Sequence, residues 1–161
     1  MAPELFKYIF ANLLPEVIVH SQSQAEEQIR DHYHLQVHCI HSVFVGGDGF
    51  YEWFLGPRMI YTSGVILDAE KHASLEELQD NILRFVCSKL NFKPEDRLLD
   101  VGCGWGTLAT YAAKNYDCDV TSITLGKNQT KFGNERIKFN GVTPDKARIL
   151  CMDYREIPGG P

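Results

Sequence analysis

The fold is decided by the stretch Leu98-Leu99-Asp100-Val101-Gly102-Cys103-Gly104-Trp105-Gly106. Its first half is a short apolar run with an acid near its end, which is typical of a buried β-strand. Three glycines then alternate with other residues, and glycine permits backbone angles that other residues avoid. We expect a helix to begin at Thr107, so the glycines form a strand-to-helix turn where a ligand can approach the main chain.

The residues on both sides of this turn repeat the order of strand and helix. Upstream, Ser74 and Glu77 have the spacing of a capping box, which predicts the start of another helix. Strands that alternate with helices form a parallel sheet with right-handed crossovers. We therefore predict an α/β fold with strands at 97–101, 119–125 and 147–152 and helices at 74–90, 107–115 and 127–140.

The spacing of the glycines narrows the choice of ligand. A dinucleotide site has the pattern GxGxxG and an acid at the end of its second strand. Here Thr107 takes the place of the third glycine, and the second strand ends in Thr124-Leu125-Gly126 without an acid. Asp100 would repel a diphosphate but attract the α-amino group of S-adenosylmethionine, which is therefore the expected cofactor. A nicotinamide or flavin site, and a turn that only packs a helix, are the alternatives.

Composition and charge exclude several classes of protein. The chain has 161 residues, of which 44% are hydrophobic and 23% charged, as in one globular domain. A net charge of −5 argues against a nucleic-acid partner. The five cysteines are scattered without a CxxC pair, which favours reduced thiols in an intracellular protein. No apolar run is long enough to predict a transmembrane segment.

The first third of the chain is less regular. Residues 1–14 have an amphipathic pattern, so we expect a helix that packs on the domain or contacts a membrane surface. A second helix is expected at 23–33. The histidines and the cysteine between residues 34 and 41 lack the spacing of a zinc site, so we expect a loop or short strand and no metal. A glycine-rich turn at 46–49 and a packed irregular segment at 50–64 should follow.

Several segments resemble a known family. Residues 97–106, 120–129 and 147–157 are similar to class I S-adenosylmethionine-dependent methyltransferases, and more narrowly to the cyclopropane fatty acid synthase family. Members of that family share the DVGCGWG turn found at Asp100–Gly106. The fungal sphingolipid C9-methyltransferase branch is the most similar. Further segments that resemble the family are Asp31-His32-Tyr33, Gly47–Tyr51, Phe54–Gly64, Leu125–Gln129 and Cys151–Pro158.

The resemblance implies an activity and a role for individual residues. The family transfers the sulfonium methyl group to a carbon–carbon double bond of a lipid chain, so a sphingolipid or fatty acyl substrate is expected. A base must then remove a proton, and Ser63 is the one residue implied near that base. The implied cofactor contacts are Gly102, Gly104 and Gly106 for the methionine part, Asp100 for its charged end, Thr124, Leu125 and Gln129 for the ribose and adenosine, Asp153 for the adenine amino group, and Tyr61 and Thr62 as a cover.

Departures from the family pattern shape the expected organisation. Residues 34–46 match nothing in the family, and we interpret them as an insertion or a gene-model error. The chain stops at Pro161, after the third strand, so it lacks the downstream catalytic residues of the family. The resemblance implies that the full-length relatives are membrane-bound through spanning segments near the N-terminus, and we expect no such segment in this chain. We expect residues 1–73 to be a helical and irregular substrate-side extension, and 74–161 to be the first half of a Rossmann-like cofactor-binding domain.

The expected function is that of an S-adenosylmethionine-dependent lipid methyltransferase of the sphingolipid C9-methyltransferase type. As it stands, the chain is expected to be an inactive fragment of such an enzyme. Cyclopropane fatty acyl phospholipid synthesis, or cofactor binding without catalysis, are the alternatives.

Overall fold

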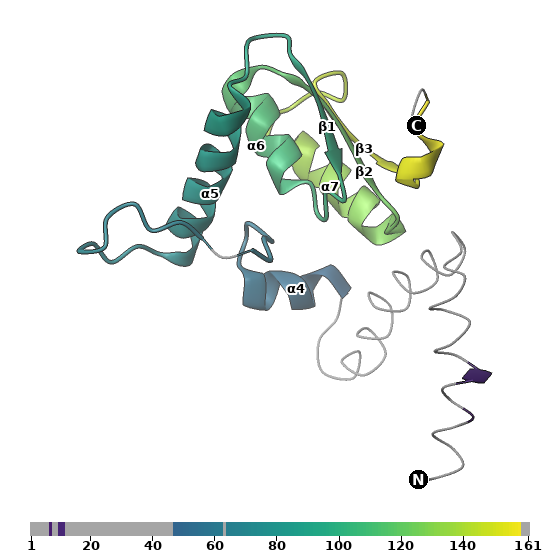
Figure 1. Cartoon of the computed structure of the whole chain (residues 1–161), viewed down its shortest axis with the longest axis horizontal. Helices are drawn as coiled ribbons and strands as arrows, with labels where there is room; N and C mark the ends of the chain where they lie inside the picture. Colours follow the sequence, from purple (N-terminus) through teal and green to yellow (C-terminus); the bar gives the residue numbers. More distant parts are fainter. Residues whose placement is uncertain (1–6, 8–9, 12–46, 63, 159–161) are drawn as a thin grey trace.

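The computed structural model describes residues 7, 10–11, 47–62 and 64–158 (Figure 1). Short loops join the helices and strands downstream of residue 90. In chain order the elements are α4 (Gly47–Leu55), α5 (Leu75–Leu90), β1 (Arg97–Val101), α6 (Thr107–Tyr116), β2 (Asp119–Thr124), α7 (Lys127–Phe139), β3 (Ala147–Cys151) and the 3-10 helix η2 (Tyr154–Glu156).

The strands form one parallel sheet in the order β1-β2-β3. Leu99 of β1 lies opposite Thr121 of β2, which in turn lies opposite Arg148 of β3. Helices α6 and α7 pack against the sheet, and α5 packs on α6 (Figure 1). The predicted alternation of strands and helices is therefore confirmed, and the observed bounds differ from the predicted ones by at most one residue.

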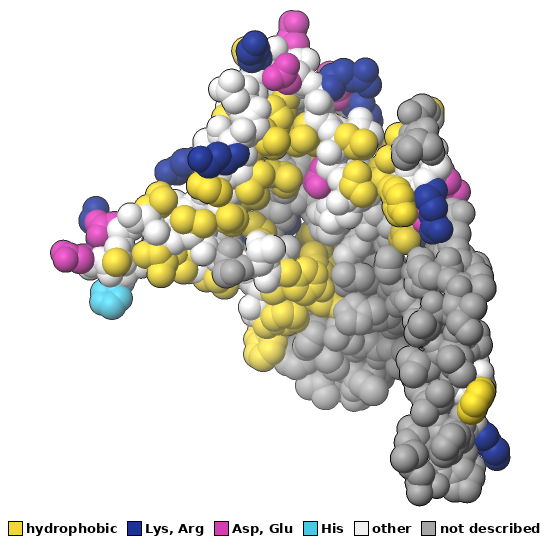
Figure 2. Space-filling model, viewed as in Figure 1, with side chains coloured by type: hydrophobic (Ala, Val, Ile, Leu, Met, Phe, Trp, Pro, Cys, Tyr) yellow, Lys and Arg dark blue, Asp and Glu magenta, His cyan; other side chains and the backbone are white. Residues whose placement is uncertain are grey.

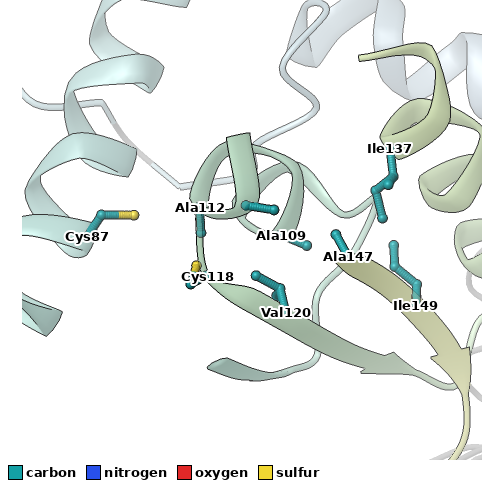
Figure 3. Packing of buried hydrophobic residues seen from close by; sticks show 9 residues of the cluster. Cys87, Ala109, Ala112, Cys118, Val120, Ile137, Ala147 and Ile149 are labelled. Atoms are coloured by element: carbon teal, nitrogen blue, oxygen red, sulfur yellow. The ribbon is translucent and has the colours of Figure 1, made fainter. Parts of the chain in front are cut away.

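The core lies between the sheet and the two helices α6 and α7 (Figure 3). Ala109 and Ala112 are fully buried, and their small side chains let α6 lie close to Val120 of β2. Ile137 of α7 and Ile149 of β3 point toward each other and fill the other half (Figure 3). Each fully buried aliphatic side chain of this size stabilises the fold by about 1.5–3 kcal/mol.

Two cysteines extend this core toward α5. Cys87 of α5 and Cys118, which precedes β2, are both 0% exposed. Burial raises the pKa of the Cys87 thiol to about 11, so this thiol is protonated at neutral pH. All four cysteines within the described part of the chain are free thiols.

The start of α5 follows the predicted capping box. The Ser74 hydroxyl accepts a hydrogen bond from the Glu77 amide at 3.2 Å, and the Glu77 carboxylate accepts one from the Ser74 amide at 2.8 Å. The helix ends at Asn91, which adopts a left-handed conformation with a φ of 51°. The division of the chain at residues 73 and 74 into two parts stays a prediction.

The expectation of a glycine turn followed by an irregular segment is wrong for residues 47–55, where α4 forms. It is confirmed for residues 56–62, which form turns and irregular backbone. The physical reason for the helix is tertiary packing. Tyr51 and Leu55 lie one helical turn apart, and both are buried in a cluster with Met59 and Trp105. Burial of these large side chains outweighs the weak helix propensity of glycine at the start of α4.

Other predictions fall on parts that are not described. The helices expected at 1–14 and 23–33 lie outside the described residues, apart from Lys7, Phe10 and Ala11, as does the segment 34–46 that we interpret as an insertion or a gene-model error. Over the described ranges, no helix has both the length and the apolar character that are needed to cross a bilayer.

Part of the apolar surface remains uncovered. Figure 2 shows hydrophobic side chains over α4 and α5, where Trp53 is 73% and Phe85 48% exposed. On the sheet, Leu99, Val101 and Leu150 are 48%, 56% and 42% exposed. Because β1 pairs only with β2 among the described residues, this sheet has an open edge as well as an exposed apolar face.

Candidate cofactor site

The turn after β1 is built on three glycines in left-handed conformations. The φ angle is 79° at Gly102, 54° at Gly104 and 74° at Gly106, a region that residues with a side chain rarely adopt. The amides of Gly102 and Cys103 both donate to the carbonyl of Ile123 on β2, at 2.9 and 3.1 Å. The turn is therefore fixed against the neighbouring strand, and α6 begins directly after it.

The three glycines meet different surroundings. A Cβ atom added at Gly102 or Gly104 would find no heavy atom within 4 Å. A Cβ atom at Gly106 would lie 2.4 Å from Cδ1 of Ile149, and one at Gly133 of α7 would lie 2.2 Å from the same atom. A side chain at Gly106 would therefore have to displace the Ile149 side chain, whereas Gly102 and Gly104 border open space that a ligand could enter.

Asp100 lies near the carboxyl end of β1, beside the turn. Burial raises the pKa of its carboxyl group, and a long hydrogen bond of 3.5 Å from the Ser122 hydroxyl partly opposes that rise. Among the described residues, no cationic side chain forms a salt bridge with Asp100. A partly buried carboxylate is stabilised by a positive partner, so this position suits an ammonium group supplied by a ligand.

Thr124, Leu125 and Gln129 lie where β2 passes into α7. The Thr124 hydroxyl donates to Oε1 of Gln129 at 2.8 Å and accepts a hydrogen bond from the amide of Gly126 at 3.3 Å. Gln129 is 4% exposed. These bonds fix the connection between β2 and α7, and the contacts of the three residues with a ribose stay predictions.

Asp153 follows β3 and is 3% exposed. Its two carboxylate oxygens accept hydrogen bonds from Nε and a terminal nitrogen of Arg155 at 2.8 and 2.7 Å. This guanidinium lowers the pKa of the Asp153 carboxyl to about 2. Asp153 is therefore an ionised acceptor at neutral pH, and Arg155 holds its orientation. The contact of Asp153 with an adenine amino group stays a prediction.

Tyr61 and Thr62 approach the glycine turn from upstream. The ring centroid of Tyr61 lies 5.3 Å from that of Trp105 and 6.1 Å from that of Tyr51. Trp105 belongs to the turn and is 2% exposed, whereas Tyr61 is 53% exposed. This aromatic contact places Tyr61 beside the turn, with Thr62 exposed next to it. Ser63 lies outside the described residues.

The predicted site residues gather at one edge of the sheet. Asp100, Thr124 and Asp153 lie at or just after the carboxyl ends of β1, β2 and β3, which are neighbours in one parallel sheet. Ligands of open α/β sheets bind at this edge. Sequence reasoning missed two residues that shape this edge of the sheet, Trp105 and Arg155. Trp105 stands inside the glycine motif, and Arg155 follows Asp153 by two residues.

A cavity of about 670 Å³ lies elsewhere, between α4, α5, α6 and α7. Its lining includes Glu52, Asp80, Tyr111 and Phe132 and none of the predicted cofactor residues. This cavity is therefore separate from the sheet edge where the predicted cofactor residues lie.

A parallel sheet, a glycine turn after its first strand and a partly buried acid beside that turn define a Rossmann-like domain of the S-adenosylmethionine-dependent methyltransferase type. The sequence matches the mycolic acid cyclopropane synthetase family over residues 20–160, and the chain belongs to this family.

Individual relatives agree with this assignment. The chain is similar to sphingolipid C9-methyltransferase A of Emericella nidulans, with 54% identity over 159 residues. The match covers 97% of this chain and 29% of that protein. In structure, the chain is similar to the cyclopropane synthase MmaA2 from Mycobacterium tuberculosis, with a TM-score of 0.61 and 32% identity. It is equally similar, at a TM-score of 0.61 and 30% identity, to the mycolic acid cyclopropane synthase CmaA1 complexed with SAH and CTAB.

Both structural matches cover 68% of this chain and 38% of the solved chain. These findings confirm the expected family and fold. The chain spans about 29% of the length of the sphingolipid relative that it matches.

Proposed function

We propose that this chain binds S-adenosylmethionine at the carboxyl edge of its sheet. We further propose that it forms the first part of the cofactor-binding domain of a lipid C-methyltransferase of the sphingolipid C9 type. The observation that carries the proposal is Asp100, a partly buried acid without a salt-bridge partner among the described residues. It stands beside two glycines, Gly102 and Gly104, whose missing side chains leave open space.

The residues at this edge fit the parts of the cofactor. Gly102 and Gly104 leave room for the methionine part, and Asp100 offers the negative charge that its ammonium group requires. Asp153 is an ionised acceptor suited to the adenine amino group, because its arginine partner lowers its pKa to about 2. When bound, S-adenosylmethionine supplies a methyl group activated by a sulfonium. The chain's own contribution is to bind and orient it.

The remaining assigned contacts complete this proposed site. Thr124, Leu125 and Gln129 face the ribose and adenosine. Gly106 lets the turn lie close to Ile149, and Tyr61 and Thr62 cover the cofactor. Aromatic packing between Tyr61 and Trp105 supports the cover, because it brings the exposed Tyr61 ring to the turn.

The substrate class is proposed from the relatives. A relative that is 54% identical is named a sphingolipid C9-methyltransferase, so we propose a sphingolipid whose double bond accepts the methyl group. Formation of cyclopropane rings on fatty acyl chains is the alternative reaction, since solved cyclopropane synthases share the fold. Residues 1–14 are proposed either to pack on the domain or to contact a membrane surface inside the cell, and Ser63 is proposed to lie near the catalytic base.

A second candidate function is cofactor binding without catalysis. It is favoured for this polypeptide because the match covers 29% of the sphingolipid relative. Removal of a proton from the methylated lipid needs a positioned base, and we assign none within the described residues. We therefore expect cofactor binding but no methyl transfer by residues 1–161 alone.

Calorimetric titration with S-adenosylmethionine tests the binding proposal. Asp100→Asn removes the charge and keeps the shape of the side chain, and it should weaken binding about tenfold or more. The matched control is Asp117→Asn, because Asp117 precedes β2 at the opposite edge of the sheet and is paired with Lys146. Equal losses in both variants, or no loss in Asp100→Asn, would contradict the assignment of Asp100.

Incubation with radiolabelled S-adenosylmethionine and a ceramide substrate tests the second part. Binding without labelled lipid is the expected result for residues 1–161. Labelled lipid formed by this polypeptide would show that its own residues supply the catalytic base.

A further inference from the structure

The turn that joins α4 to Tyr61, residues Leu55–Ile60, has an unusual backbone. Met59 has a φ of 54°, in the left-handed region that a bulky side chain rarely adopts. Its side chain is 3% exposed and packs with Tyr51 and Trp105. Strained backbone of this kind persists only where the surroundings hold it in place. Contacts with the surrounding helices must therefore hold this turn in its conformation.

Three side chains from three different helices bind the carbonyl groups of this turn. Nε2 of Gln79 on α5 donates to the carbonyls of Leu55 at 3.0 Å and Ile60 at 3.3 Å. The Thr107 hydroxyl on α6 donates to the carbonyl of Arg58 at 2.5 Å. We call Gln79, Thr107 and Arg136 the carbonyl clamp.

Arg136 of α7 completes the clamp. Its guanidinium donates to the carbonyls of Pro57 and Arg58, and to the Thr107 hydroxyl at 2.6 Å. Burial lowers the pKa of Arg136, and no salt bridge to it is found among the described residues. This half-buried guanidinium thus donates its hydrogen bonds to the backbone carbonyls of one turn and to Thr107, which indicates that the position of that turn matters.

Gln79 shows the same pattern. It is 1% exposed, and its Oε1 atom finds no hydrogen-bond partner within the described part of the chain. A buried acceptor without a partner is unfavourable, so a nonpolar residue would be the more stabilising choice if Gln79 only filled the core. The side-chain amide of Gln79 instead donates two hydrogen bonds to the turn.

The clamp connects this turn directly to the cofactor edge. Thr107 is the first residue of α6 and follows Gly106 of the glycine turn. On the other side, Ile60 precedes Tyr61, whose ring lies against Trp105. The turn is therefore linked to the glycine motif in two ways. Thr107 follows Gly106 along the backbone, and the ring of Tyr61 contacts the ring of Trp105.

We infer that Gln79, Thr107 and Arg136 are positioning residues that hold Tyr61 and Thr62 over the glycine turn. This inference rests on the proposed function, because the two positioned residues are the proposed cover of S-adenosylmethionine. The clamp residues themselves do not touch the cofactor. They act through the turn, so their loss should matter only while Tyr61 is present.

A double-mutant cycle on the full chain tests this. Gln79→Met keeps the length of the side chain and removes both donated hydrogen bonds. We expect it to weaken S-adenosylmethionine binding about tenfold in the wild-type background and less than about twofold in the Tyr61→Ala background. Arg136→Lys, which keeps the charge but not the forked donors, should show the same dependence on Tyr61. Equal losses in both backgrounds would overturn the inference.

A matched control separates positioning from general stability. Asn134 of α7 also binds backbone through a half-buried side-chain amide, since it donates to the Ile149 carbonyl at 2.9 Å and accepts from the Ile149 amide at 3.1 Å. Asn134→Leu should lower the free energy of unfolding, yet its effect on cofactor binding should not depend on Tyr61.

Hydrogen exchange in the absence of ligand tests the carbonyl clamp independently of cofactor binding. Gln79→Met should accelerate exchange in a peptide that covers residues 55–62, whereas Asn134→Leu should not. If the wild-type chain fails to bind S-adenosylmethionine, the proposed function is wrong, and this exchange experiment still decides whether the clamp holds the turn. Unchanged exchange at 55–62 in Gln79→Met would show that it does not.

Discussion

Alanine substitutions in the glycines separate core packing from ligand binding. Gly106→Ala would place a Cβ atom 2.4 Å from Cδ1 of Ile149, at a residue with a φ of 74°. Overpacking of a core costs about 1–3 kcal/mol, and a side chain in the left-handed region costs about 1–2 kcal/mol. Since Ile149 is 3% exposed and cannot move away freely, we expect Gly106→Ala to lower the free energy of unfolding by about 2–5 kcal/mol.

Alanine substitutions at two other glycines separate the cost of the left-handed backbone from the cost of overpacking. Gly141 has a φ of 76°, and a Cβ atom there would meet nothing within 4 Å, so Gly141→Ala reports the backbone cost alone. Gly133→Ala reports the packing cost in an ordinary helical conformation, because its Cβ would lie 2.2 Å from Cδ1 of Ile149 and 3.2 Å from the carbonyl oxygen of Trp105. Gly106→Ala should therefore be more destabilising than Gly141→Ala.

Urea unfolding followed by circular dichroism measures these differences. The added variant Ile149→Val removes the Cδ1 atom that both alanines would meet. The double variants of Ile149→Val with Gly106→Ala or Gly133→Ala should be more stable than the sums of their single effects, whereas the pair with Gly141→Ala should be additive. Additivity in all three pairs, or equal losses for Gly106→Ala and Gly141→Ala, would refute the packing role of Gly106.

Four further outcomes are expected. Gly104→Val should abolish S-adenosylmethionine binding in calorimetry, because its side chain would enter the open space that we assign to the ligand. The carboxyl of Asp153 has a pKa of about 2 in the folded chain, below its ordinary 3.8, so its contribution to stability is present above about pH 4 and is lost toward pH 2. The difference in urea stability between wild type and Asp153→Asn should therefore shrink over that range. The exposed apolar side chains on the sheet favour self-association, which we expect the chain to show in size-exclusion chromatography, and Leu99→Lys should reduce it because Leu99 is 48% exposed. Alkylation by iodoacetamide should modify the exposed Cys151 before the fully buried Cys87, whose pKa of about 11 disfavours the thiolate.

The sheet and its helices could be predicted because their signals are local. The capping box at Ser74, the β-branched run of β2 and the glycine turn each act over a few residues, and the structure places elements at those positions. The cofactor edge follows from the same rule, since the carboxyl ends of adjacent parallel strands meet. Asp100, Thr124 and Asp153 could thus be assigned to one edge from their places in the sequence.

The rest depends on contacts between distant residues. Helix α4 is stabilised by Trp105, which lies far along the chain from Tyr51. The packing role of Gly106 depends on Ile149, and nothing in the glycine motif itself distinguishes Gly106 from Gly104. The carbonyl clamp joins Gln79, Thr107 and Arg136 to one turn, and its sequence separations range from 19 to 79 residues. No local pattern encodes such contacts.

A crystal structure of the chain with bound S-adenosylhomocysteine tests the central claim most directly. We predict that the ligand lies at the carboxyl edge of the sheet, with its amino group against Asp100 and its adenine beside Asp153. Ligand density in the cavity between α4, α5, α6 and α7, with the edge beside Gly102 and Gly104 left empty, would contradict it.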